Sequence, residues 1–251
     1  MNFINVPNLP QKMVRLVLVD GRISPEIEEA LRNKGINVIK TLNLQGVYEA
    51  VSCHPDIMLH HLGGKRVVYA PGTHGDVLAA LRNYGFQLVK GSTGLSFKYP
   101  YNIAYNAARV GGFVFHNLKY TDPVLKRELV NAGIEPVHVN QGYSKCSVAV
   151  VDSRSIITAD AGIAGAAGKK GIDCLLLEPD EGIVLPGLNC GFIGGSTGLI
   201  SSNKLAVAGE ISFLKSFHSI LEFLNKRGIE VISLSQGHVL DIGSIIPLME
   251  E

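Results

Sequence analysis

Apolar and polar residues follow two recurring patterns along the chain. Residues Val124, Leu125, Leu129 and Val130 fall on one stripe of a helix, and such a stripe must pack on a sheet. Each helical pattern is followed by a glycine and a short apolar run typical of a strand, as in GIEVISL. The pattern predicts helices over residues 24–34, 75–84, 122–132, 161–170 and 210–227, each followed by a strand.

Local signals mark both ends of these helices. Ser24-Pro25 and Asp122-Pro123 each combine an N-cap residue with proline at the first helical position. A glycine after the last turn permits the positive φ that often ends a helix. Such glycines stand at positions 35, 85, 133, 171 and 228.

A second glycine follows each predicted strand, at positions 46, 91, 142, 182 and 237. Two apolar runs come after it, such as CSVAVVD and SIITAD, and the turn-like SRS between them favours a hairpin. Each repeat therefore consists of three short strands and one helix.

The last repeat is divided between the two ends of the chain. HVLDIGSIIPLMEE supplies its C-terminal part, and VRLVLVD with the first helix supplies the rest. Pairing of these strands would close a ring and leave no open edge. We therefore expect residues 1–251 to form one α/β domain around a central channel. A doubly wound parallel sheet is the alternative for strands that alternate with helices.

Composition narrows the class of protein. Apolar residues make up 46% of the chain, and the formal net charge of +1 comes from scattered charges, so we expect no nucleic-acid partner. We find no run of 18 apolar residues and no signal-peptide pattern, and we expect a cytoplasmic protein without a membrane partner. The four cysteines form no CxxC pair, so we expect reduced thiols, no metal and no cofactor. We expect a small-molecule ligand, and a homo-oligomer remains open.

Two stretches resemble the pentein superfamily, the guanidine-modifying enzyme fold. SCHPDIML is similar to its His-x-Asp motif, and GIEVISLSQGHVLDIGSIIPL is similar to its closing segment. The resemblance implies a five-bladed α/β propeller of ββαβ units. It also implies that His54 is the acid/base and that the Asp56 carboxylate binds a guanidinium group. The superfamily includes deiminases, dimethylarginine hydrolases, amidinotransferases and non-catalytic ribosome-binding initiation factors.

The sequence departs from that pattern at the nucleophile. The superfamily's cysteine stands four residues before a Pro-Leu, and Gly243 occupies that position here. The His-x-Asp motif also lies in the second repeat, whereas the deiminases carry it in a later one. The later repeat here carries Ser144-Lys145-Cys146-Ser147.

Polar candidates cluster where each repeat enters its first strand, which we expect to face the channel. A thiol, an imidazole and a carboxylate together can attack a planar C–N centre, protonate its leaving amine and orient a cation. We expect catalysis by His54, Cys146 and Asp241, and substrate binding by Asp56, Asn106, Arg109, Asn189, Cys190 and His238.

Two functions follow from these residues. The first is a hydrolase or amidino-type transferase that acts on a small guanidine, amidine or amide-like compound, with Cys146 or Cys190 as its nucleophile. The second is a non-catalytic ring that binds a metabolite or a protein, with both thiols as buried core residues.

Overall fold

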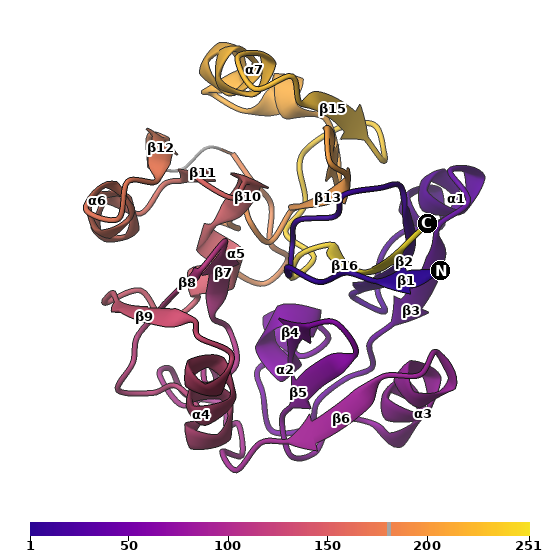
Figure 1. Cartoon of the computed structure of the whole chain (residues 1–251). Helices are drawn as coiled ribbons and strands as arrows, with labels where there is room; N and C mark the ends of the chain where they lie inside the picture. Colours follow the sequence, from indigo (N-terminus) through magenta and orange to yellow (C-terminus); the bar gives the residue numbers. More distant parts are fainter. Residues whose placement is uncertain (180–181) are drawn as a thin grey trace.

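The computed structural model describes residues 1–179 and 182–251 and shows a mixed α/β protein with five small sheets. Figure 1 shows the sheets following one another around the centre of the molecule, with the longer helices at the periphery. We call each sheet, with its helix, a unit and number the units from 1 to 5. Unit 1 has β16 (Ile246–Glu250), β2 (Val14–Val19) and β3 (Asn37–Lys40), with β1 (Asn2–Phe3) at its edge, and unit 2 has β4 (Leu59–Gly63), β5 (Arg66–Tyr69) and β6 (Gln87–Lys90). Unit 3 has β7 (Ala108–Val110), β8 (Phe113–His116) and β9 (Glu135–His138), unit 4 has β10 (Ala149–Asp152), β11 (Ser155–Thr158) and β12 (Asp173–Leu176), and unit 5 has β13 (Thr197–Ser201), β14 (Lys204–Val207) and β15 (Glu230–Ser233).

All five units share one strand order. The first two strands pair antiparallel, and the second pairs parallel with the third across a helix, so each unit reads ββαβ. In unit 1 the C-terminal strand β16 pairs antiparallel with β2, as expected from the divided repeat. The alternative of one doubly wound sheet is wrong.

In the described ranges no strand ladder joins one unit to the next. The units are connected instead by hydrogen bonds near the centre. One donor of each unit reaches the preceding unit, and the series returns to its starting point. The bonds run from Asp56 N to Gly243 O, from Asn106 Nδ2 to Asp56 O, from Lys145 N to Asn106 O, from Gly195 N to Cys146 O and from Ser244 N to Gly195 O.

Two of the helices begin at the expected N-caps, Ser24 and Asp122. The Ser24 hydroxyl accepts from Ile27 N, and the Asp122 and Asp160 carboxylates each accept from the backbone N–H three residues on. The glycines after all five helices have positive φ. The helices are α1 (Pro25–Asn33), α3 (Gly75–Asn83), α4 (Pro123–Asn131), α6 (Ala161–Gly168) and α7 (Phe217–Asn225).

Two expectations for these helices were wrong. The segment 210–227 is not one helix, because Leu214 is buried with an extended backbone and separates a 3₁₀ turn, Ile211–Phe213, from α7. On α4, Leu125 and Leu129 are buried as expected, but Val130 lies at the edge of the stripe and is exposed. No helix in the described part of the chain is long and apolar enough to cross a membrane.

Two of the segments that carry candidate residues are one-turn helices and not strand starts. Helix α2 (Pro55–Met58) precedes β4, and α5 (Ser144–Ser147) precedes β10. A further 3₁₀ turn covers Glu49–Val51. Asp56, Cys146 and Gly243 each stand three residues before the first strand of their unit. These three positions are therefore equivalent in the repeat.

Candidate active site

The central hydrogen bonds bring four candidate residues from three units into one buried cluster. His54 and Asp56 come from the start of α2, Cys146 from α5, and Asp241 from the loop before β16. All four are at most 3% exposed. The structure thus brings together the three residues expected to be catalytic and one expected to bind the substrate.

The Cys146 thiol lies between a carboxylate and an amide. Its Sγ donates to Asp56 Oδ2 at 3.1 Å and accepts from Asn106 Nδ2 at 3.1 Å. Asn106 Oδ1 in turn accepts from the backbone N–H groups of Lys145 (2.8 Å) and Cys146 (3.3 Å). Asn106 therefore fixes both the position of α5 and the direction of the thiol.

Asp56 is also held from the opposite side. The Ser244 hydroxyl lies 2.7 Å from Asp56 Oδ2 and 2.9 Å from Gly194 O, and it accepts from Lys145 Nζ at 2.9 Å. Ser244 has φ +79°, a conformation that costs free energy in a non-glycine residue and persists where the surroundings impose it. Asp56 Oδ1 has no hydrogen-bond partner among the described residues.

The His54 ring lies between two carboxylates. Its Nε2 is 3.8 Å from Asp20 Oδ2, and its Nδ1 is 3.9 Å from Asp241 Oδ1. The Asp20 carboxylate is already paired with Arg22, and Asp241 accepts from the backbone N–H groups of Phe192 and Gly243. Both distances leave the imidazole close enough to exchange a proton after a small movement.

Glycine at position 243 makes room for this histidine. A Cβ on Gly243 would overlap the Cβ and Cγ of His54, and the glycine has φ +66°. A Cβ on Gly195 would likewise overlap the Asp241 carboxylate. The position that the sequence resemblance assigns to a nucleophile is therefore filled by the His54 ring.

Burial dominates the proton affinities of the cluster. It raises the pKa of Asp56 to about 6 against the influence of Lys145, and it raises the pKa of Asp241. Burial, Asp56 and Asp241 together raise the pKa of the Cys146 thiol well above its usual value. Burial lowers the pKa of Lys145 and of His54, although neighbouring carboxylates oppose it. At neutral pH the thiol is protonated and the imidazole is neutral.

A cavity of about 280 Å³ opens onto the cluster. Cys146, His54 and Asp241 line its inner end, and the Tyr48 and Tyr143 hydroxyls, 3.2 Å apart, line its wall. A second cavity of about 250 Å³ reaches the other side of His54. A small ligand can therefore reach the thiol.

Comparison with known proteins places the chain in a family. The model of a family described as a family of unknown function (DUF6873) matches residues 18–246. The chain belongs to this family. No curated protein sequence matches the chain.

Solved structures share the fold of this DUF6873 protein at low sequence identity. Inosamine-phosphate amidinotransferase of Streptomyces griseus aligns with TM-score 0.61, 10% identity, and 100% and 97% coverage of this chain and that one. Substrate-bound C. jejuni agmatine deiminase aligns with a TM-score of 0.58 and 11% identity, and the alignment covers 99% of this chain and 96% of that one. DDAH from Pseudomonas aeruginosa, complexed with citrulline, aligns with a TM-score of 0.57 and 8% identity, and the alignment covers 94% of this chain and 100% of that one. All are pentein superfamily members, so the resemblance in fold is confirmed.

The other expected site residues lie at different depths. Asn106 belongs to the cluster, and Asn189 and Cys190 are exposed on the rim of the 280 Å³ cavity. Arg109 lies outside that cavity and lines a separate one of about 20 Å³ behind Asp56. His238 is exposed, packs on the Phe213 ring at 4.8 Å between centroids and does not line the cavity. The expectation that every such segment points into one channel was therefore too broad.

Three residues of the cluster were not among the expected site residues. Lys145 precedes Cys146 in the sequence, and because the two lie in a helical turn and not in a strand, both side chains reach the cluster. Asp20 is a carboxylate at the end of the apolar run VRLVLV, which is a signal that sequence reasoning can use. Ser244 had no such signal, because its role depends on contacts with other units.

The cluster also contains a donor set for a metal ion. His54, Asp56 and Cys146 each offer one ligand atom, and these atoms lie within 4.8 Å of one another. Nitrogen, oxygen and sulfur donors of this kind fit zinc. The Cys146 thiol, whose pKa is raised, would have to lose its proton before it could bind a metal ion. The sequence prediction of no metal remains a prediction.

Proposed function

We propose that this protein is a cysteine-dependent enzyme that acts on a small guanidine or amidine cation, with Cys146 as its nucleophile. The observation that carries the proposal is the buried thiol, held between Asp56 and Asn106 at the end of a cavity. The fold shared with amidinotransferases, DDAH and agmatine deiminase supports it.

The charges of the cluster favour a cationic substrate. Asp20 is neutralised by Arg22, whereas Asp56 and Asp241 face the single ammonium group of Lys145. One negative charge is left over when both carboxylates are ionised, and an uncompensated buried charge is costly. A bound guanidinium group would compensate it and would lower the pKa of the Cys146 thiol.

The repeat accounts for the changed position of the nucleophile. Cys146 in unit 4 and Gly243 in unit 1 are equivalent positions, three residues before their strands. Both positions face the centre, so a thiol from unit 4 can approach the same ligand from another direction. We propose that the five units are blades of one propeller domain around a central channel, which the cyclic hydrogen bonds between units support.

The proposed reaction begins at the thiol. The Cys146 sulfur attacks the planar carbon of the guanidinium group, and its proton passes to Asp56 Oδ2. That proton then moves to the leaving nitrogen, the C–N bond breaks, and a neutral amine departs from an S-amidino cation.

Water completes hydrolysis. Its oxygen attacks the amidino carbon while His54 takes one proton, and the C–S bond then breaks as the remaining hydroxyl proton passes to the leaving sulfur. Urea or a substituted urea is released, the thiol is restored, and His54 returns its proton to solvent. An amine that attacks instead of water would give transfer of the amidino group. The neutral state of His54 suits it to accept this proton.

A panel of guanidines and amidines tests the proposal. Wild-type protein should release an amine or ammonia from at least one compound, and acid quenching should trap an adduct on Cys146. Cys146→Ser should lose turnover by about 10³-fold or more. Cys174→Ser, which changes a half-buried thiol in β12, is the matched control and should keep full activity. Undiminished turnover by Cys146→Ser would refute the assignment.

A second candidate function is ligand binding without catalysis. The raised pKa of the Cys146 thiol favours it, because the thiol and not the thiolate is present at neutral pH. Saturable binding of a guanidine that is recovered unchanged, with no adduct, would support this function. Turnover that disappears with a chelator and returns with zinc would instead support the metal donor set.

A further inference from the structure

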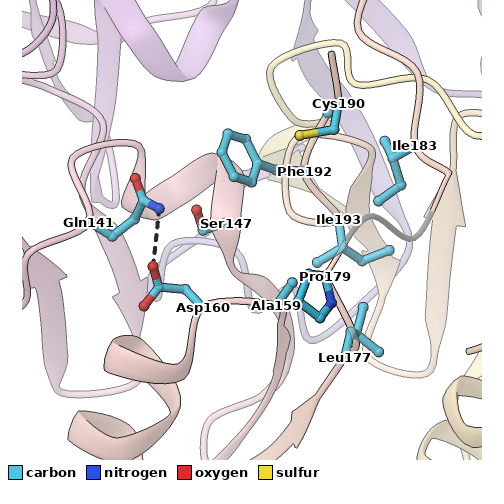
Figure 2. Close-up of a pocket in the computed structure, with 11 residues that line it drawn as sticks. Gln141, Ser147, Ala159, Asp160, Leu177, Pro179, Ile183, Cys190, Phe192 and Ile193 are labelled. Atoms are coloured by element: carbon cyan, nitrogen blue, oxygen red, sulfur yellow. Dashed lines mark hydrogen bonds between the residues drawn. The ribbon is translucent and has the colours of Figure 1, made fainter. Parts of the chain in front are cut away.

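Another cavity lies beside the 280 Å³ cavity of the candidate active site and shares two wall residues with it. It has a volume of about 170 Å³ and is lined by Cys190 and Phe192, which also line the cavity that reaches Cys146. Figure 2 shows Phe192 above Ser147, the residue that follows Cys146 in α5. The two cavities therefore adjoin at Cys190 and Phe192.

The wall of this 170 Å³ cavity is mainly apolar. Figure 2 shows Ala159, Leu177, Pro179 and Ile193 along one side of it. An apolar cavity of about 150 Å³ in another protein binds benzene. A volume of about 170 Å³ thus accommodates a group the size of a phenyl ring.

Ser147 adds one polar atom to this wall. It is 2% exposed, and its Oγ has no hydrogen-bond partner within the described residues. The nearby Gln141 and Asp160 are already bonded to each other at 3.1 Å, and Asp160 also caps α6. An unpaired buried hydroxyl is costly, and a ligand hydroxyl can satisfy it.

We infer that this cavity binds an aromatic substituent of the substrate, so that the substrate class is an N-arylalkyl guanidine or amidine. The inference rests on the proposed function, since the reacting group would lie at Cys146 and the ring beyond Cys190 and Phe192. A hydroxyl on the ring would hydrogen-bond to Ser147.

Cysteine-directed probes of increasing length test the inference. The parent probe is 2-chloroacetamidine, and the others carry N-benzyl, N-(2-phenylethyl) or N-(3-phenylpropyl) groups. At least one of these tethers should raise the second-order labelling rate of Cys146 about tenfold or more over the parent, because the ring leaves water. Rates are normalised to those with free cysteine.

A variant that fills the cavity provides the control. Ala159→Phe replaces an exposed residue of the rim and should remove the advantage of the phenyl probes but leave the parent rate unchanged. Ala132→Phe, at an exposed alanine after α4, should change neither rate. Ser147→Ala should slow only a hydroxyphenyl analogue of the best probe.

The outcomes separate this inference from the proposed function. Equal rates for all probes with efficient parent labelling would overturn the phenyl site and keep the proposed function. If no probe labels Cys146, calorimetry with 3-phenylpropylguanidine and guanidine decides. Binding that is stronger for the phenyl compound and is lost in Ala159→Phe supports the site, and equal or absent binding overturns it.

Discussion

Residue 243 shows how one missing side chain reorganises the centre. A Cβ at Gly243 would overlap His54, whereas the equivalent position in unit 4 carries the Cys146 thiol. The imidazole and the thiol cannot therefore occupy the arrangement that the closing segment of the sequence suggests. They approach the same central space from units 2 and 4.

Gly243→Ala should destabilise the protein more than Gly237→Ala. Both glycines have positive φ, but a Cβ at Gly237 meets no atom within 4 Å. Gly237→Ala should cost about 1 kcal/mol of unfolding free energy, and Gly243→Ala about 1–3 kcal/mol more through overlap with His54. Urea denaturation of both variants measures the difference. Equal losses of unfolding free energy would show that His54 moves to accommodate a Cβ at position 243 at little cost.

The sequence predicted part of this cluster from residue types alone. His54, Asp56 and Asp241 were identified from motifs, and Cys146 from its reactive side chain, and the structure brings all four together. Whether they perform the expected chemistry stays a prediction. Depth could not be judged from a pattern along the chain, because the pattern does not show that His238 is exposed and packs on Phe213.

At the scale of single elements, one carboxylate connects two units. Asp122 Oδ1 caps α4, and Oδ2 accepts from Ser92 N, Thr93 N and the Tyr105 hydroxyl. Burial would raise the pKa of Asp122, but these hydrogen bonds outweigh it and lower the pKa. The glycine-rich stretch at residues 91–95 thus cradles an anion, which is a carboxylate of the same chain.

Asp122→Ala should cost more than the loss of a helix cap. We expect a loss of about 2 kcal/mol in unfolding free energy, because the buried Tyr105 hydroxyl and the Ser92 and Thr93 N–H groups lose an acceptor along with the α4 cap. Asp160→Ala removes the cap of α6 and one bond from Gln141, and should cost about 1 kcal/mol. Similar losses in thermal or urea denaturation would mean that the link between units contributes little.

The helices could be predicted well because their ends carry local signals. The caps Ser24 and Asp122 and the glycines after each helix act within a few residues. The break before α7 could not, because Leu214 leaves the helix to be buried among residues of other elements. The one-turn helices α2 and α5 are too short for an apolar period.

Across the whole molecule, buried histidines set the response to acid. Burial lowers the pKa of His60 to about 3 and of His61 and His116 to about 4. Because these values are below that of an unfolded histidine, their contribution to stability is present above pH 6.5 and is lost as the pH falls through the folded values. Asp56, with its pKa raised to about 6, acts in the opposite direction.

Stability should therefore fall from pH 6.5 to pH 4, since four histidines with a lowered pKa, including His54, outweigh the two carboxylates Asp56 and Asp241. His60→Gln should reduce this loss by about 3 kcal/mol, and Asp56→Asn should enlarge it by about 2–3 kcal/mol. Urea denaturation at each pH gives the unfolding free energies. A loss that is the same in wild type and His60→Gln would contradict the neutral buried state of this histidine.

The repeat and the division of unit 1 between the chain ends could be predicted from the glycine pattern, and the pairing of β16 with β2 confirms that division. The cyclic hydrogen bonds between units could not, because they join residues far apart in sequence. We propose above that Cys146 lies in a site that binds a cation.

The most direct test compares a cationic and a neutral probe of the same shape. Labelling of Cys146 by 2-chloroacetamidine and by 2-chloroacetamide is followed by peptide mass mapping at pH 7, with rates normalised to free cysteine. We predict a preference of about tenfold or more for the cation, and loss of most of that preference in Asp56→Asn. Equal rates for the two probes, or a preference unchanged in Asp56→Asn, would contradict the account.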